Sequence, residues 1–219
     1  MIDQTLTSDI TLQERIGMGG FGEVFRAHQA SLDRVVAVKL LKPSLASDSK
    51  AVRRFRQEAR SLARTAHPNI VTIYDVGQTD SGQHFLVMEM LEGRTLADAL
   101  KEGLPPERLT PLAVQLADAV AAAHEAGVIH GDLTPHNVFL RSDVGAMPDF
   151  VSVLDFGLAR LAEADAPQSS AAGTGAYMSP ERVLGERQTP ASDGYALGLL
   201  LYEMFAGRRP YPPPSGPLA

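Results

Sequence analysis

The sequence contains no cysteine, which excludes disulfide bonds and thiolate metal sites. It also lacks an excess of basic residues, because 20 Lys and Arg stand against 26 Asp and Glu and give a net charge of -6. A nucleic-acid-binding domain needs a basic surface to neutralise phosphates, so we expect no nucleic-acid partner. The absence of cysteine accords with a reducing compartment, and we expect a cytoplasmic protein.

Long hydrophobic runs are also absent. The longest, residues 195–205, is interrupted by Glu203 and is far shorter than the ~20 residues that span a bilayer. We interpret it as a buried helix and expect no membrane segment in this chain. The first residues, 1–4, do not begin the basic region and apolar run that form a signal peptide.

The pattern of apolar residues changes along the chain. Residues 10–91 are typical of β-strands, whereas apolar residues after position 93 recur at helical spacing. The expected strands lie at 35–41, 70–74 and 84–89, and the expected helices at 50–65 and 111–126. A strand-rich part followed by a helix-rich part predicts an α+β fold of two lobes, joined near residues 89–93.

A glycine cluster lies between two of the strand-like segments. Residues 17–24 fit the pattern G-x-G-x-x-G-x-V, in which glycines let the backbone approach phosphates and expose its N–H groups. Alone, such a cluster is more often a simple turn. A dinucleotide-binding fold would need a helix to begin at the last glycine, but residues 24–27 resemble the return strand of a hairpin.

Lys39 is the first candidate functional side chain. It follows the apolar strand residues 36–38, where a lysine is costly unless its charge is paired. Glu58 offers a partner, because it lies in the expected helix on the same inward face as Phe55 and Leu62. The alternative is an edge lysine whose amine reaches solvent.

The stretch His130-Gly131-Asp132-Leu133-Thr134-Pro135-His136-Asn137 is the most informative in the chain. It separates Asp132 from Asn137 by five positions, and Asp155-Phe156-Gly157 follows downstream. Two side chains suited to bind metal, beside a carboxylate base, are what phosphoryl transfer from Mg-ATP to a hydroxyl requires.

With these motifs in this order, the chain resembles the protein kinase superfamily, and in particular the bacterial, eukaryotic-like serine/threonine protein kinases. The resemblance implies a two-lobed α+β fold: a small antiparallel β-sheet lobe with one helix, and a mainly helical large lobe that here lacks its last helices. The implied boundaries are an N-terminal extension at 1–9, a kinase domain at 10–210 and a proline-rich tail at 211–219. Within the domain they are an N-lobe at 10–88, a hinge at 89–93 and a partial C-lobe at 94–210.

The resemblance also implies a role for each candidate residue. Asp132 would accept the proton of the attacking hydroxyl, and Lys39, held by Glu58, would bind the α- and β-phosphates of ATP. Asn137 and Asp155 would hold Mg²⁺, for which Mn²⁺ is an alternative. The implied ATP-binding residues are Ile16, Gly17, Gly19, Gly20, Phe21, Gly22, Val24, Ala37, Lys39, Met88, Glu89, Leu91 and Phe139. Met88 would be the gatekeeper, with Glu89, Met90 and Leu91 as the hinge.

Gly131 departs from the family pattern. Many relatives have an arginine there that binds a phosphate on the activation segment. Without that guanidinium, ordering of residues 158–181 cannot depend on an arginine–phosphate pair at this position. We therefore expect phosphorylation of Ser169, Ser170 or Thr174 to change turnover only modestly.

Thr134 departs from the pattern in a more serious way. Protein serine/threonine kinases usually place there a lysine that contacts the γ-phosphate, and losing such a donor commonly costs ~3 kcal/mol of transition-state stabilisation. One hypothesis is that His136 partly substitutes for it. The interpretation that we favour is that His136 faces solvent.

The C-terminal part raises two further expectations. The arginine that usually pairs with Glu181 comes from a region beyond residue 219, so we expect Glu181 either to be a buried charge without its partner or to turn to solvent. An apolar face of the helix at 193–205 would also be uncovered, which invites a partner.

These observations leave three hypotheses for function. The leading one is transfer of phosphate from ATP to serine and threonine hydroxyls of an unknown protein substrate. The alternative is a weak or inactive kinase-like binding or scaffold module, which Thr134 favours. A lesser alternative is a small-molecule phosphotransferase, because such enzymes often carry His-Gly-Asp, although the Gly-Thr…Tyr-Met-Ser-Pro-Glu segment at 173–181 favours the protein-kinase branch.

Overall fold

The computed structural model describes residues 4–43, 49–142, 144, 149–156 and 174–211 of the 219. Ser169, Ser170 and the proline-rich tail beyond Tyr211 lie outside the described residues, as does the side chain of Thr174. No helix in the described ranges is long and apolar enough to cross a membrane.

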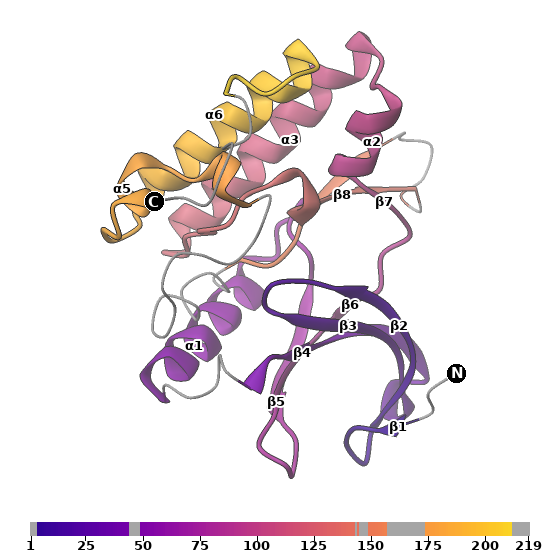
Figure 1. Ribbon diagram of the computed structural model, residues 1–219. Coiled ribbons are helices and arrows are strands. Elements are labelled where there is room, and N and C mark those ends of the chain that lie inside the picture. The colour runs from indigo at the N-terminus through magenta and orange to yellow at the C-terminus, as the bar shows by residue number, and fades with distance from the viewer. Residues whose placement is uncertain (1–3, 44–48, 143, 145–148, 157–173, 212–219) are drawn as a thin grey trace.

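The N-terminal lobe is built on an antiparallel sheet (Figure 1). Its strands are β1 (Gln4–Thr5), β2 (Ile10–Met18), β3 (Gly22–Gln29), β4 (Arg34–Leu41), β5 (Ile73–Gln78) and β6 (His84–Glu89). They lie in the order β1-β2-β3-β4-β6-β5. Residues 4 and 5, from the expected N-terminal extension, pair with β2 at the sheet edge.

Alternating side chains of β4 and β6 enter two different cores. Val36, Val38 and Val87 pack into one cluster, while Ala37 and Met88 pack into another together with Phe55 of helix α1 (Ser49–Thr65). Because successive residues of a strand point to opposite faces, the sheet is buried on both sides here. The continuous apolar run of β4 is therefore explained by a strand buried on both faces.

The strand expected at 70–74 was placed too early in the sequence. Strand β5 begins only at Ile73, and residues 69–71 bond instead with the large lobe. The N–H of Val71 donates to the carbonyl of Val153, and the N–H of Val153 donates to the carbonyl of Asn69. A β-rich apolar sequence does not specify which strand it joins, and here a strand of the other lobe takes these backbone groups.

The large lobe consists mainly of helices together with a three-stranded sheet, β7-β8-β9. Its elements are β7 (Gly93–Thr95), α2 (Leu96–Glu102), α3 (Pro106–Glu125), the 3-10 turn η3 (Pro135–Asn137), β8 (Val138–Arg141), β9 (Phe150–Val153), the 3-10 turn η4 (Thr174–Tyr177), α5 (Pro180–Val183) and α6 (Pro190–Ala206). Figure 1 shows α3 and α6 side by side, and both contribute to the largest core cluster.

The helix predicted at 111–126 is present but begins earlier than expected. Helix α3 starts at Pro106, where the fixed φ of proline suits the first helical position. Pro111 lies inside the helix rather than at its start. Helix α6 begins with a capping box between Thr189 and Ser192 and ends at Gly207 in the left-handed conformation.

The described elements have the predicted α+β arrangement of a sheet lobe with one helix and a helical lobe (Figure 1). The expected exposure of an apolar face of α6 is also observed. Tyr195, Tyr202 and Phe205 of α6 are 36%, 41% and 55% exposed, although the opposite side of the same helix is buried.

Candidate active site

The glycine cluster forms the turn of the β2–β3 hairpin, where the N–H of Gly19 donates to the carbonyl of Gly22 at 2.8 Å. A Cβ atom on Gly22 would lie 1.9 Å from the carbonyl oxygen of Leu40 in β4, so the fold requires glycine there. A Cβ on Gly19 or Gly20 would meet nothing within 4 Å, and neither residue has a positive φ. The fold therefore does not explain these two glycines, whereas close approach of a ligand to the backbone does.

Lys39 lies on β4 beneath this hairpin with its amine 5.6 Å from the ring centroid of Phe21. Its Nζ is 2.5 Å from Oδ2 of Asp155, and the two side chains are only 4% and 16% exposed. A buried ammonium is costly unless paired, and this ion pair provides the charge. Glu58 lies half-buried in α1, next to the buried Ala59.

Asp155 follows β9 and has a φ of 62°, a left-handed conformation that is unfavourable for a non-glycine residue. Strain of this kind costs about 1–3 kcal/mol and is concentrated at functional sites. The next residue, Phe156, is buried and packs its ring against that of His130, with centroids 4.6 Å apart. Leu62 and Phe156 belong to one core cluster, and Ile73 packs against it, so these residues link the two lobes.

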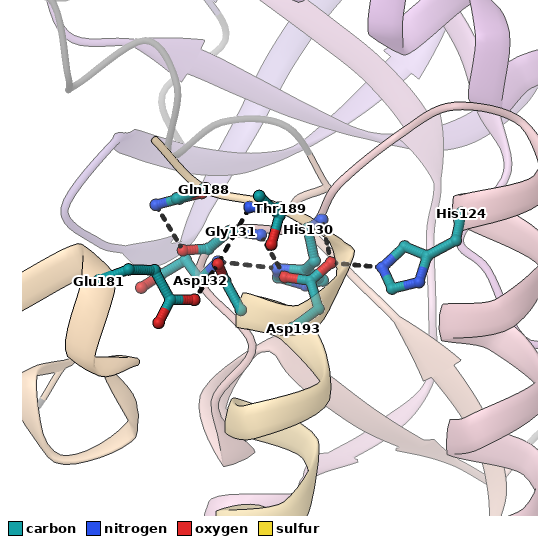
Figure 2. Close-up of polar contacts among 9 residues, drawn as sticks. His124, His130, Gly131, Asp132, Glu181, Gln188, Thr189 and Asp193 are labelled. Carbon is teal, nitrogen blue, oxygen red and sulfur yellow. Dashed lines mark hydrogen bonds and ion pairs between the residues drawn. The ribbon is translucent and has the colours of Figure 1, made fainter. Parts of the chain in front are cut away.

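The loop at 130–137 is held from below by one carboxylate of α6. Figure 2 shows Asp193 between the His124 ring and the backbone of His130 and Gly131. The carboxylate accepts the N–H groups of His130 and Gly131 at 2.7 and 2.8 Å, and its Oδ2 lies 2.8 Å from Nε2 of His124. Asp193 is 1% exposed. These bonds satisfy backbone donors that are otherwise costly to bury, so they fix the loop's path.

His130 is fully buried, and each of its two ring nitrogens makes a hydrogen bond. One nitrogen must accept and the other must donate. Its Nδ1 accepts the N–H of Asp132 at 3.2 Å, so its Nε2 carries the proton and donates to the carbonyl of Leu154 at 2.9 Å. Both bonds are satisfied together only by the neutral ring. Burial lowers the pKa of His130 in agreement with this tautomer, against the opposing effect of Asp193 and other carboxylates.

Asp132 and Asn137 meet at the top of the loop. Nδ2 of Asn137 donates to the backbone carbonyl of Asp132 at 2.8 Å and lies 3.3 Å from its Oδ2. The carbonyl of Asn137 accepts the N–H of Leu154, which ties the loop to the residue before Asp155. Burial raises the pKa of Asp132 above that of an ordinary aspartate, and the charge of Arg182 acts in the opposite direction.

The residues expected around adenine are distributed over both lobes. Ala37 and Met88 lie in one buried cluster, against which Phe21, Val24 and Leu91 pack. Phe139 lies half-buried on β8 of the large lobe, and Ile16 is 45% exposed near the end of β2.

Glu89, the expected hinge residue, is largely engaged by the fold. Its N–H donates to the carbonyl of Thr72, and its carboxylate accepts the N–H of Thr72 and pairs with Arg141 at 3.1 Å. Its backbone N–H and its carboxylate are thus both held by the fold.

Comparison with known proteins decides the family. Residues 10–217 match the family described as protein kinase domain. The chain belongs to the protein kinase family.

Curated relatives agree with this assignment. Serine/threonine-protein kinase pkn3 of Myxococcus xanthus is 39% identical over 218 residues, and pkn2 of the same organism is 43% identical over 210. PrkC of Bacillus subtilis is 36% identical over 215 residues. The matched segments cover 96%, 93% and 96% of this chain but only 40%, 24% and 32% of those relatives.

A solved structure shows the same fold. The crystal structure of the Mycobacterium tuberculosis PknI kinase domain matches with a TM-score of 0.77 at 27% identity, covering 97% of this chain and 82% of that one. This confirms the two-lobed kinase fold that the sequence predicted.

The backbone conformation at position 131 explains why this chain has a glycine there. Gly131 has a φ of 77°, in the region that glycine adopts without steric cost. A side chain at this position would be strained by about 1–2 kcal/mol. Glycine therefore suits the bend that presents the N–H to Asp193 and the carbonyl to the opposite side.

Thr134 and His136 differ in their surroundings. Thr134 is buried and lines a hollow below Asp132, whereas His136 is exposed. The exposure agrees with our favoured interpretation that His136 faces solvent.

Glu181 is not left without a partner, contrary to our expectation. Oγ of Ser192, in the first turn of α6, donates a hydrogen bond to its carboxylate at 2.5 Å. This hydrogen bond is the largest of the effects that lower the pKa of Glu181. In place of the expected arginine, a hydroxyl eleven positions downstream thus bonds to this carboxylate.

The site fits a nucleotide with its metal ion. The described residues contain no group of three or more His, Cys, Asp or Glu side chains that could hold a metal alone. Mg²⁺ is usually held by one or two carboxylates together with phosphates and water, and Asp155 with Asn137 is a donor set of that kind. The N–H of Gly19 is used within the hairpin turn, so of these two glycines Gly20 is the one whose backbone N–H suits phosphate oxygens.

Two contributors to this site were missed by sequence reasoning. Arg182 and Gln188 both donate to the carbonyl of Gly131, Gln188 at 3.4 Å. They lie more than fifty residues beyond Gly131, and no local pattern connects them with the loop. Only the packing of α5 and α6 beneath the loop brings them there.

Proposed function

We propose that this chain is the catalytic domain of an ATP-dependent protein kinase that transfers the γ-phosphate of Mg-ATP to serine and threonine hydroxyls of proteins. The observation that carries the proposal is the convergence of three connected groups. Lys39 pairs with Asp155 at 2.5 Å, Leu154 beside Asp155 bonds to Asn137, and Asn137 bonds to Asp132. A cation, a metal-binding pair and a carboxylate base thus meet where the two lobes join.

Each of these side chains has a task in the proposed reaction. The substrate hydroxyl oxygen forms a bond to the γ-phosphorus while the bond from phosphorus to the bridging oxygen breaks and ADP leaves. Asp132 accepts the hydroxyl proton. Lys39 neutralises charge on the α- and β-phosphates, with Glu58 assigned to hold it, and the N–H groups of the glycine hairpin position the phosphates.

Asp155 and Asn137 are the residues that would hold Mg²⁺, which supplies charge neutralisation on the β- and γ-phosphates. The apolar cluster of Ala37, Met88, Val24 and Leu91 would exclude water around adenine, with Ile16 and Phe139 at its edges. The assignment to serine and threonine rests on the names of the relatives, which are serine/threonine-protein kinases.

The proposal is tested by incubating the purified chain with Mg²⁺, γ-labelled ATP and dephosphorylated casein. We expect label on serine and threonine of casein or of the chain itself. Asp132→Asn removes the base and should abolish transfer. Asp118→Asn is the matched control, because Asp118 is an exposed carboxylate on α3, and it should retain the wild-type rate.

A kinase-like binding module is the second candidate, and the observation that favours it is Thr134 in place of a phosphate-binding lysine. Thermal stabilisation by ATP without any transfer would support this module and overturn the proposal. Transfer only to small hydroxyl compounds such as aminoglycosides would instead support a small-molecule phosphotransferase.

A further inference from the structure

The loop at 130–137 has no lysine or arginine of its own, yet a guanidinium lies against it. Nη1 of Arg182 donates a hydrogen bond to the carbonyl of Gly131 and lies 3.5 Å from Oδ1 of Asp132. The Arg182 and Asp132 side chains are 21% and 10% exposed. Because both groups are largely removed from water, their interaction is screened less than that of a surface ion pair.

Arg182 and Thr134 reach the same space. Both line one hollow beneath the loop, together with Gly131, Asp132, Ser179 and Ser192. A charged side chain at either of these two positions would therefore border the same hollow. A cation can enter this hollow from the loop or from α5, and in this chain it comes from α5.

The neighbour of Arg182 is engaged elsewhere. Glu181 accepts a hydrogen bond from Ser192 of α6. The carbonyl of Gly131 receives a second donor, Nε2 of Gln188. Arg182 is therefore part of a set of contacts that holds the underside of the loop, and among them it is the contact that reaches the carboxylate of Asp132.

We propose that Arg182 is a positioning residue for phosphoryl transfer, which holds Asp132 and supplies beside it the positive charge that Thr134 lacks. The proposal rests on the proposed function, because it acts through Asp132. Through the carbonyl of Gly131 it fixes the backbone that carries this carboxylate. Through its charge it favours the carboxylate orientation that faces the hollow.

Neutral variants test the role directly. Arg182→Gln and Arg182→Met should lower kcat roughly 10- to 100-fold, the range expected for losing a hydrogen bond to a charged group, and should change KM for ATP less than twofold. Arg182→Lys keeps the charge and should lose less than tenfold. Arg187→Gln is the matched control, because Arg187 is exposed in the same segment, and its kcat should equal that of the wild type.

A second substitution separates this role from a structural one. Thr134→Lys introduces a cation into the same hollow. In the Arg182→Gln background it should restore kcat at least severalfold, whereas in the wild-type background the two like charges compete and kcat should not rise. If Arg182 only supported the fold, the effect of Thr134→Lys on kcat would not depend on whether Arg182 is present. The melting temperature of each variant is measured beside its kinetics.

The outcomes are distinct. Wild-type kcat in Arg182→Gln, or a Thr134→Lys effect that is the same in both backgrounds, overturns the inference and leaves the proposed function intact. If both neutral variants fail to fold, Arg182 has a structural role and the inference is also overturned. If the wild-type chain transfers no phosphate while binding ATP, the proposed function fails and the inference fails with it.

Discussion

The glycine hairpin and the loop at 130–137 lie on the two sides of the same candidate site. They differ in how far contacts within the fold explain their residues. Gly19 and Gly20 meet no atom that would exclude a side chain, so the fold leaves their identity unexplained. The start of the loop, by contrast, is fixed by buried bonds, because Asp193 accepts the backbone N–H groups of His130 and Gly131. We assign the hairpin glycines to the binding of a ligand, whereas the loop is shaped by the core on which it packs.

The largest effect is expected from removing the anchor of the loop. Asp193→Ala leaves two buried N–H groups without acceptors and should lower the free energy of unfolding by about 3 kcal/mol. Urea denaturation measures this loss. Asp118→Ala, at an exposed site on α3, should change it by less than about 0.5 kcal/mol. If the two variants are equally stable, the loop is not held as described.

The hairpin itself offers the next test, because two of its glycines should behave differently. Gly22→Ala forces the backbone of β4 to move and should destabilise the chain by about 1–3 kcal/mol. Gly19→Ala should leave stability unchanged and raise the KM for ATP, since its Cβ would point into the space that the phosphates need. Melting temperature and KM are measured for both. A stability loss in Gly19→Ala would contradict the distinction.

Gly131→Ala probes the loop with a smaller change. Its φ of 77° should cost an alanine about 1–2 kcal/mol of stability, and the bend should relax. We expect kcat to fall in parallel, because the carbonyl that Arg182 contacts would move. Unchanged unfolding free energy, measured in urea, would show that the left-handed conformation is not required.

The smallest expected effect is a pH dependence of stability. Burial lowers the pKa of His130, so the unfolded chain binds more protons below the ordinary value of 6.5. Stability should therefore be full above 6.5 and fall as the pH drops below it, by up to about 1.4 kcal/mol per pH unit for one histidine. His84, whose pKa burial also lowers, contributes in the same direction.

His130→Phe keeps an aromatic ring against Phe156 and should flatten this dependence, leaving the share that comes from His84. Urea denaturation between pH 5 and 7.5 measures the slope for both proteins. A slope in the variant that equals the wild-type slope would mean that His130 is not buried as the neutral tautomer.

The sequence predicted the fold and the positions of its motifs because these depend on local spacing. The strand at 84–89 was expected from its apolar run, and the hairpin at 17–24 from its glycine spacing and the strand-like residues after it. Residues 70 and 71 were wrongly expected to belong to a strand of the small lobe. A short apolar run does not reveal which lobe will form hydrogen bonds with its backbone. The partners of Gly131 and Glu181 were missed for a similar reason. Arg182, Gln188 and Ser192 reach them only through the packing of α5 and α6 under the loop.

The most direct test of the central claim is the rate of γ-phosphate transfer by the wild type and by Asp132→Asn at saturating Mg-ATP. The buried carboxylate of Asp132 is assigned as the base, so the substitution should lower the rate roughly 10²- to 10⁴-fold. ATP should stabilise both proteins equally against thermal unfolding, since Asp132 is assigned no role in nucleotide binding. Equal rates of transfer in the two proteins would contradict the account.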